Sequence, residues 1–517
     1  NWALDNKKKV IGFVGITFLI GLILIPLSGM EFMPERDDSR ITIMATLPIG
    51  TNLDETTRIM KLIEERTLPI FKEEELKVVM VRAGYGKGTN AAFNDLTDYK
   101  ARIQIELKMR KYRERSKAEI RDILRKALQG IPGVTYNFTY QSRGSSSIGM
   151  GSEGATISIE VYGYDFEQSN QYVQSITNSI KNIPGLKDID ISREEGLPEK
   201  VVVVNREKAS KMGINAYQVA NLIKDNVSGF VASRYRFEGD EYDINVRLRE
   251  ADRQTVEQIK ALEINTPTGK RIKIGSVVDI IDKTGPTAID RKNHERVVYI
   301  NCKAEGRALS TVAADINSVL NKIPKPQNFY VSIGGSYEDM QDTFNDLLLV
   351  LILGGILTYV IMAAQFESLI RPFIVMFSVP TCMFGVSLFM FLTGSQFSVA
   401  TLLGIIMLVG IVVNNAIVLV DYTDILIQRG WGLREALVEA GTKRLRPIMM
   451  TTLTTVLSLI PMAFSGGDGS EMSQPIGRAV MGGMSTGFIF TLIFIPIIYM
   501  IVETRREKHA AKHKAKF

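Results

Sequence analysis

Cysteine is scarce in this chain of 517 residues, and charge is missing from six long stretches of it. The two cysteines are Cys302, in a polar region, and Cys382, in the middle of an apolar segment. Because residues in such different surroundings cannot pair, the sequence excludes a disulfide framework for the polar region. That region is long enough to hold two or more domains, each folded around its own apolar core.

The six stretches without a charged side chain have the length of membrane-spanning helices, since about 20 helical residues cross roughly 30 Å of hydrocarbon. They are residues 10–29, 347–366, 372–393, 399–420, 447–465 and 479–502. The first lacks a signal-peptide cleavage pattern after its apolar core, which predicts a retained helix. The sequence therefore predicts an integral membrane protein with one helix, a large polar region over 31–346, and five further helices.

Lysine and arginine are absent from the short loops at 394–398 and 466–474, whereas they gather in the alternate loops and in the tail 505–517. Because basic loops stay in the cytoplasm, this asymmetry predicts cytoplasmic N- and C-termini and an extracytoplasmic region 31–346. The net charge of +6 reflects these basic flanks, so we do not infer nucleic-acid binding from it.

The polar region repeats one pattern, in which a helical segment is followed by Ile-Pro and then by an alternating, strand-like run. The pattern occurs at 125–140, 178–192 and 317–333. Proline ends the helix, and glycine in two copies permits the following turn. Strand–helix–strand units of this kind predict small α+β sandwiches with helices on one face of a mixed sheet.

Motifs for nucleotide chemistry are missing. The loop AGYGKGTN (83–90) and the Gly/Ser-rich segment 142–154 have no P-loop or dinucleotide spacing. A hinge or substrate-gating loop is one interpretation of these glycines, and an uninvolved surface loop is the other.

Two amides, Asn414 and Asn415, interrupt the fourth apolar stretch. An amide in hydrocarbon needs a partner, so the pair predicts either packing against polar groups on an ion pathway or simple adhesion between helices. Hydroxyls in the next stretch could supply partners, because Thr451, Thr454, Thr455 and Ser458 share one helical face. Alternatively these hydroxyls bond carbonyls of their own helix. Since none of the six stretches carries Asp, Glu, Lys, Arg or His, an acid for proton coupling must come from elsewhere.

Several segments of the sequence resemble the C-terminal half of an RND (resistance–nodulation–division) efflux transporter of the hydrophobe/amphiphile multidrug type. The resemblance covers essentially the whole chain. It is carried by FMPERD (32–37), LPIGTNLDET (47–56), GGSYEDM (334–340), AAQFESLIRPFIVMFSVP (363–380), VGIVVNNAIVLVDY (409–422) and LREALVEAGTKRLRPIMMTTLTT (433–455).

The resemblance implies a membrane α-helical bundle of six helices, one plus five, with an extracytoplasmic α+β region of ferredoxin-like βαβ porter subdomains. The implied parts are a first helix with its basic flank (1–30), a first porter subdomain (31–140), a second (155–205 plus 276–335), a docking insert (206–275), a five-helix bundle (343–504) and a basic tail (505–517).

The resemblance also implies roles for particular residues. Asn414, Asn415, Arg446 and Thr451 match a transmembrane polar network that the family associates with proton relay; drug pumps have lysine at the position of Asn414. The substrate-binding positions are Met80, Tyr85, Tyr136 and Phe138, and for Tyr136 and Phe138 the alternative is ordinary strand core. Gly84, Gly86 and Gly88 match the switch loop, and Lys87 replaces a pocket phenylalanine.

The implied function is half of a proton-driven exporter of amphiphilic compounds in the bacterial inner membrane, a transporter and not an enzyme, without cofactor or metal. The implied partners are a homologous N-terminal half with the proton-binding aspartates, two further copies forming a homotrimer, a periplasmic adaptor and an outer-membrane channel. A heavy-metal RND exporter is an alternative that would need clustered Met, Cys or acidic ligands. A membrane-anchored binding or scaffold module is another.

Replacing Asn414 or Thr451 by alanine should abolish efflux by the complete protein without loss of the folded trimer, because each would remove a polar group of the relay. Dye efflux from cells producing each variant at parental levels measures this, and unchanged efflux would refute a relay role.

Overall fold

The computed structural model describes residues 1–34, 37–84, 97–138, 156–193, 196–267, 269–285, 289–467 and 469–514. Tyr85, Gly86, Lys87 and Gly88, which the sequence assigns to a pocket or switch loop, lie outside these ranges. The chain divides into two compact units, one of Asn1–Ser192 with Asp290–Phe517 and the other of Arg193–Ile289.

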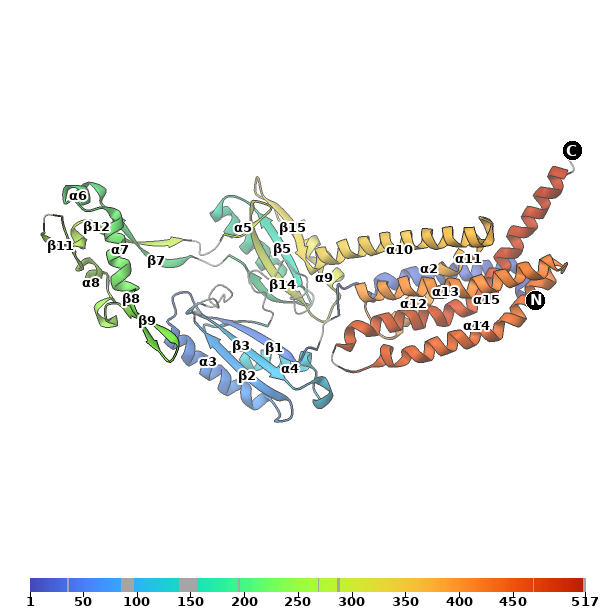
Figure 1. Ribbon diagram of the computed structural model, residues 1–517, viewed down its shortest axis with the longest axis horizontal. Coiled ribbons are helices and arrows are strands. Elements are labelled where there is room, and N and C mark those ends of the chain that lie inside the picture. Colours follow the sequence, from blue (N-terminus) through green and yellow to red (C-terminus); the bar gives the residue numbers. More distant parts are fainter. Residues whose placement is uncertain are drawn as a thin grey trace. The chain divides into compact units, whose positions relative to one another are not determined.

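Six helices in the described ranges are long and apolar enough to cross a membrane, as the sequence predicts. A short helix, α1 (Trp2–Asp5), precedes the first of them. The six are α2 (Lys7–Ser28), α10 (Ser336–Phe366), the consecutive pair α11 (Ile370–Met376) and α12 (Ser378–Leu392), α13 (Val399–Gln428), α14 (Leu433–Phe464) and α15 (Ser470–Lys514). Helix α15 packs along α12, α13 and α14 (Figure 1), so it is the central contact of the bundle.

Glycines allow α15 to approach its neighbours closely. A Cβ atom at Gly482 would lie 2.5 Å from the carbonyl oxygen of Gly385 in α12. A Cβ at Gly483 would lie 2.1 Å from Leu408 of α13, and one at Gly487 would lie 2.6 Å from Sγ of Cys382. Small residues are the usual means of bringing helix backbones together in a membrane.

The first sheet is built from the order strand–helix–strand–strand–helix–strand. Its elements are β1 (Arg40–Thr46), α3 (Leu53–Thr67), β2 (Leu76–Ala83), β3 (Lys100–Leu107), α4 (Lys117–Leu128) and β4 (Thr135–Asn137). The strands are antiparallel in the order β2-β3-β1-β4. Alternate β3 residues such as Ile103 and Ile105 are buried, and Ser116 and Glu119 form a capping box that begins α4.

The second sheet unites segments far apart in the sequence. It contains β5 (Thr156–Tyr162), β6 (Leu186–Ile191), β13 (Arg291–Lys292), β14 (Glu295–Ala304) and β15 (Tyr330–Gly335). Strand β14 pairs with β5, β6 and β13, and β15 pairs with β5. Helices α5 (Phe166–Ile180) and α9 (Leu309–Leu320) contribute to its apolar core. Helix α10 begins at the residue after β15, so the sheet continues directly into a membrane helix.

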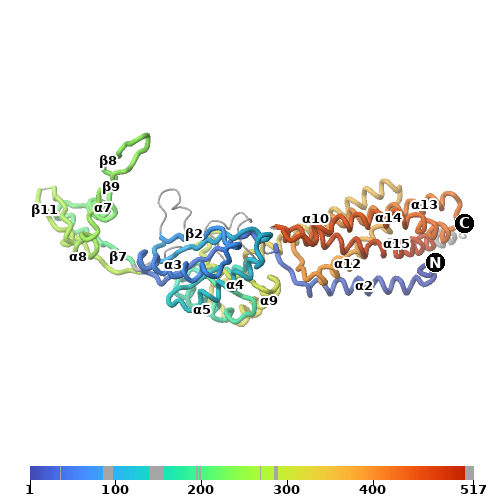
Figure 2. Tube along the Cα trace, turned by 90° about the horizontal axis from the view of Figure 1, so that it is seen from below, coloured from blue at the N-terminus to red at the C-terminus, as the bar shows by residue number. Residues whose placement is uncertain are grey.

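The unit Arg193–Ile289 has its own small core around Ile214, Val219 and Ile274. Its outer strands β7 (Leu197–Val204) and β12 (Val278–Gly285) pair with each other, so the compact unit begins before residue 206 and ends after residue 275. Between them lie α6 (Arg206–Lys211), α7 (Ala216–Val227), β8 (Phe230–Phe237), β9 (Asp240–Val246), α8 (Val256–Lys260), β10 (Glu263–Asn265) and β11 (Arg271–Lys273). Within this unit the β8–β9 hairpin projects away from the helices (Figure 2), and its residues are all exposed.

Gly482→Ala should destabilise the bundle by about 1–3 kcal/mol, because the added methyl group overpacks the contact between α12 and α15. Gly354→Ala is the matched control, since a Cβ at Gly354 meets no atom within 4 Å. Heating the purified protein in detergent and measuring the fraction that stays monodisperse compares the two. Equal thermal stability would show that α12 and α15 are not in close backbone contact.

Candidate functional site

Asn414 lies on a face of α13 that no other described element covers. The exposed residues Leu403, Met407, Gly410, Asn414 and Asp421 recur at helical spacing along this face, whereas Val413 and Ala416 are buried. Asn415 is half-buried next to this face. Apart from Asp421 at its end, the rest of this face is apolar, and an amide in such a position needs a polar partner in the membrane.

Three of the four hydroxyls in the predicted stripe of α14 are hydrogen-bonded inside their own helix. Thr451 donates to the carbonyl oxygen of Ile448 at 3.0 Å, Thr455 to that of Thr451 at 2.9 Å, and Ser458 to that of Thr455 at 2.8 Å. This is the alternative that the sequence left open. Thr451 and Arg446 are exposed on α14, as Asn414 is on α13, so the four predicted relay residues lie mainly on uncovered helix surfaces.

A buried carboxylate on α13 joins three helices. Asp424 is 5% exposed, and its Oδ1 accepts a hydrogen bond from the Tyr499 hydroxyl of α15 at 2.5 Å. Its Oδ2 lies 2.8 Å from Nε of Arg371 in α11. Charges in so buried a position are tolerated because they are paired and hydrogen-bonded.

Sequence reasoning missed Asp424 because the residue follows the charge-free stretch 399–420, although α13 continues to Gln428. The periodicity of α13 was the signal that could have found it. Val413, Ala416, Val420 and Asp424 are all buried at spacings of three or four residues, so the carboxylate continues the buried face.

At the opposite end of the bundle, Arg478 connects three segments by hydrogen bonds. Its guanidinium donates to Oγ of Ser395 at 2.5 Å, to the carbonyl oxygen of Ala463 at 3.0 Å and to Oε1 of Gln474 at 2.7 Å. These partners come from the segment after α12, from the end of α14 and from α15 itself. The polar contacts therefore hold both ends of the helices, while the glycine contacts lie between them.

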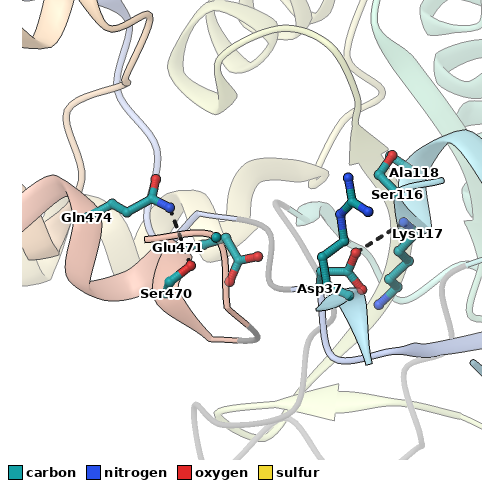
Figure 3. A pocket seen from close by; sticks show the side chains of 9 residues that line it. Asp37, Ser116, Lys117, Ala118, Ser470, Glu471 and Gln474 are labelled. Carbon is teal, nitrogen blue, oxygen red and sulfur yellow. Dashed lines mark hydrogen bonds between the residues drawn. The ribbon is translucent and has the colours of Figure 1, made fainter. Parts of the chain in front are cut away.

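A cavity of about 270 Å³ lies where the start of α4 meets the start of α15 (Figure 3). One wall carries Asp37 and Lys117, whose backbone N–H donates to the Asp37 carboxylate at 3.1 Å. The other wall carries Ser470, Glu471 and Gln474. Oε2 of Glu471 is buried and has no hydrogen-bond partner among the described residues. The cavity is thus polar, with charges of both signs, and can admit water between the first sheet and the membrane helices.

The predicted substrate residues occupy opposite edges of the first sheet. Met80 lies on edge strand β2, where it is 42% exposed, and Tyr136 lies on β4, at the other edge. Burial raises the pKa of Tyr136 to about 12, and its buried hydroxyl has no hydrogen-bond partner within the described ranges. The structure therefore does not place Met80 beside Tyr136.

Phe138 is buried rather than exposed to an open pocket. It is 4% exposed, and the guanidinium carbon of Arg125 lies 4.7 Å from the centre of its ring. Gly84, the described residue of the predicted switch loop, has a φ of +79°, and a Cβ there would lie 2.8 Å from Leu53. Both the backbone and the space at Gly84 thus favour glycine.

Metal-binding side chains are not clustered in the part of the chain that the structure describes. No group of three or more His, Cys, Asp or Glu residues there is arranged to hold a metal ion.

Asp424→Ala should destabilise the protein by about 1–3 kcal/mol, because it leaves the half-buried Arg371 guanidinium without its counter-charge and the buried Tyr499 hydroxyl without its acceptor. Asp421→Ala, three residues earlier on the exposed face, is the control and should change stability by less than about 0.5 kcal/mol. Thermal unfolding of both variants in detergent tests this, and similar melting temperatures would contradict the structural role of the Asp424 pair.

Comparison of the whole chain with known proteins identifies its family. The family model described as AcrB/AcrD/AcrF matches residues 1–503. The chain is 27% identical to the swarming motility protein SwrC of Bacillus subtilis over 98% of the chain and 47% of the relative. It is 25% identical to the cobalt-zinc-cadmium resistance protein CzcA of Cupriavidus metallidurans, over 98% of the chain and 48% of the relative.

A third relative and a solved structure complete the comparison. The chain is 27% identical to the multidrug resistance protein MdtC of Escherichia coli over 79% of the chain and 40% of the relative. A crystal structure of a heavy metal efflux pump superposes with a TM-score of 0.84 at 26% identity, over 96% of this chain and 50% of that one. The chain thus spans about half the length of the curated relatives it matches. With a family model matching nearly its whole length, the chain belongs to the AcrB/AcrD/AcrF family of RND transporters.

Proposed function

We propose that this chain is one half of a proton-driven RND exporter in a bacterial inner membrane, and that a homologous half supplies the proton-binding carboxylates. The uncovered face of α13 carries this proposal, because it presents Asn414 in an otherwise mostly apolar stripe. Thr451 and Arg446 are exposed on the neighbouring α14. A second bundle packed on these faces would bring its carboxylic acids close to the amides of Asn414 and Asn415 and to the cation of Arg446. These neighbours would then set the proton affinity of the acids.

The same proposal includes two ferredoxin-like porter subdomains that open and close around the cargo. The element order β1-α3-β2-β3-α4-β4 with sheet order β2-β3-β1-β4 supports this for the first sheet. For the second sheet, the support is the order β5-α5-β6 and β14-α9-β15 with β14 between β6 and β5, and β15 continues directly into α10. The complete pump would work as a trimer with a periplasmic adaptor and an outer-membrane channel.

Heavy-metal cations are the cargo that the comparisons favour. CzcA is named for cobalt, zinc and cadmium resistance, and the superposed crystal structure is that of a heavy metal efflux pump. The sequence by itself favoured amphiphilic compounds, with metal export as the alternative, and the comparisons support the alternative better. Under this proposal, the cation ligands come in part from the other half of the transporter or from sulfur donors such as methionine.

Amphiphilic compounds are the second candidate. MdtC is named for multidrug resistance. Exposed Met80 and half-buried Tyr136 also offer adaptable apolar surface, which suits ligands that demand little directionality. The two cargo classes therefore need to be separated by experiment.

The experiment produces the full-length transporter in a bacterial host without its own RND pumps. Cell content of zinc, cobalt, cadmium, nickel, copper and silver is measured after a metal load, and ethidium accumulation is measured in parallel. A metal exporter should lower the content of at least one metal while ethidium accumulation is unchanged. Lower ethidium with unchanged metals would instead establish the amphiphile class. The Asn414→Ala variant is the inactive control, and equal readings with and without active transporter for all solutes would refute both.

A further inference from the structure

One carboxylate oxygen in the cavity between the first sheet and α15 lacks a hydrogen-bond donor. Oε2 of Glu471 is buried, and no described residue donates to it. The neighbouring side chains on α15 are satisfied by the preceding loop, because Nε2 of Gln474 and Oγ of Ser470 donate to the carbonyl oxygen of Ser465 at 2.5 and 3.2 Å. A buried acceptor without a donor is unfavourable, so Glu471 favours a molecule in the cavity that donates hydrogen bonds to it.

The facing wall of the cavity carries positive charge. Figure 3 shows the Glu471 carboxylate pointing towards the side formed by Asp37 and Lys117, and Arg110 lines the cavity as well. Lys117 is 6% exposed, and its Nζ lies 2.6 Å from Oδ1 of Asp38. The charges of Lys117 and Arg110 disfavour a bare metal cation at Glu471, whereas they favour an anionic group carried by the same ligand.

The charges of the described lining residues balance. Asp37 and Glu471 are acidic, and Arg110 and Lys117 are basic. A ligand without net charge leaves this balance intact, so no buried charge remains without compensation. A zwitterion with a primary ammonium fits, because its N–H groups can donate to Glu471 while its anionic end lies near the bases. The volume of about 270 Å³ has room for several waters or for one small polar headgroup.

The cavity lies at the end of a membrane-spanning segment. Its lining residue Gly466 directly follows the charge-free stretch 447–465. An exposed apolar face leads from there along α14, formed by Leu453, Leu457, Ile460 and Phe464. Their spacing of four, three and four residues places them on one side of the helix. Leu453 is about 200° around the helix from Thr451, so this face differs from that of the hydroxyl stripe.

We propose that the cavity binds the headgroup of a phospholipid with a primary ammonium, such as phosphatidylethanolamine, whose acyl chains lie along the apolar face of α14. Glu471 accepts hydrogen bonds from the ammonium, and the phosphate lies towards Arg110 and Lys117. Water-soluble glycerophosphoethanolamine has the same headgroup chemistry, and the test separates it from the lipid. The site is independent of the proposed exporter function, because no transported solute takes part in it.

Lipid binding to the delipidated full-length transporter tests the site, with native mass spectrometry as the measurement. Phosphatidylethanolamine, phosphatidylcholine and phosphatidylglycerol are titrated separately. The second has an ammonium without N–H groups, and the third has no ammonium. The first phosphatidylethanolamine should bind about tenfold more tightly than either. Glu471→Gln should remove this preference, because a hydrogen bond to a charged group contributes enough affinity for a factor of about ten or more.

Two further variants make the result specific. Glu435→Gln is the matched control, since it removes an exposed carboxylate from the first turn of α14 and should keep the parental preference. Ala118→Phe leaves every charge in place but puts a larger side chain into the cavity, which Ala118 lines from an exposed position of α4. It should abolish the preference as Glu471→Gln does, and it tests the site if Glu471→Gln fails to fold.

Equal binding of the three lipids to the parent, which is annular binding without headgroup preference, would overturn the site. So would a parental preference in folded Glu471→Gln or Ala118→Phe. Glycerophosphoethanolamine should bind far more weakly than the lipid, because it has no acyl chains to contact α14, and equal affinity would overturn the lipid as occupant. None of these measurements involves efflux, so a failed lipid site leaves the exporter proposal standing, and a failed cargo assay leaves the lipid site standing.

Discussion

The close approach of α15 to its neighbours is the contact on which the rest of the membrane bundle depends. Gly482, Gly483 and Gly487 remove the side chains that would hold α12 and α13 away. Helices in a membrane gain little from apolar burial alone, so van der Waals contact at short range has to replace it. Once α15 is seated, Tyr499 reaches Asp424 at one end and Arg478 reaches Ser395 at the other. These two hydrogen bonds between helices therefore depend on the close packing of α15.

Pairing of buried charge is the second recurring constraint, and it marks the places where parts of the chain are joined. Asp424 with Arg371 joins membrane helices, and Asp188 with Arg125 joins the two sheets. A buried charge without a partner is strongly unfavourable, so each carboxylate depends on its arginine. Asn414 differs, because it is neutral and lies on an uncovered face. Such a residue suits a helix face that contacts another polar surface in the membrane.

Local sequence patterns predicted much of the architecture. The helix expected before the first Ile-Pro is α4, Lys117–Leu128, with its capping box at Ser116 and Glu119. The amide pair and the hydroxyl stripe were visible as polar interruptions of apolar runs. Asp424 was not visible in this way, because it lies beyond the charge-free stretch 399–420. Its burial also depends on Arg371, which lies 53 residues earlier in the chain. Asp188 was not visible either, since its surface-like setting, GLKDID, gives no sign of the bulge in β6 or of the pairing with Arg125.

The sequence by itself determined that this is an integral membrane protein, how many apolar helices it has and to which family it belongs. These properties depend on composition and on short motifs of consecutive residues. The tertiary structure decided which polar residues are paired. It placed Met80 and Tyr136 on opposite edges of a sheet, bonded the hydroxyls of Thr451, Thr455 and Ser458 to carbonyls of their own helix, and set Arg125 over the ring of Phe138. Such outcomes depend on strand order, register and side-chain direction between distant segments. Neighbouring residues in the sequence carry little of that information.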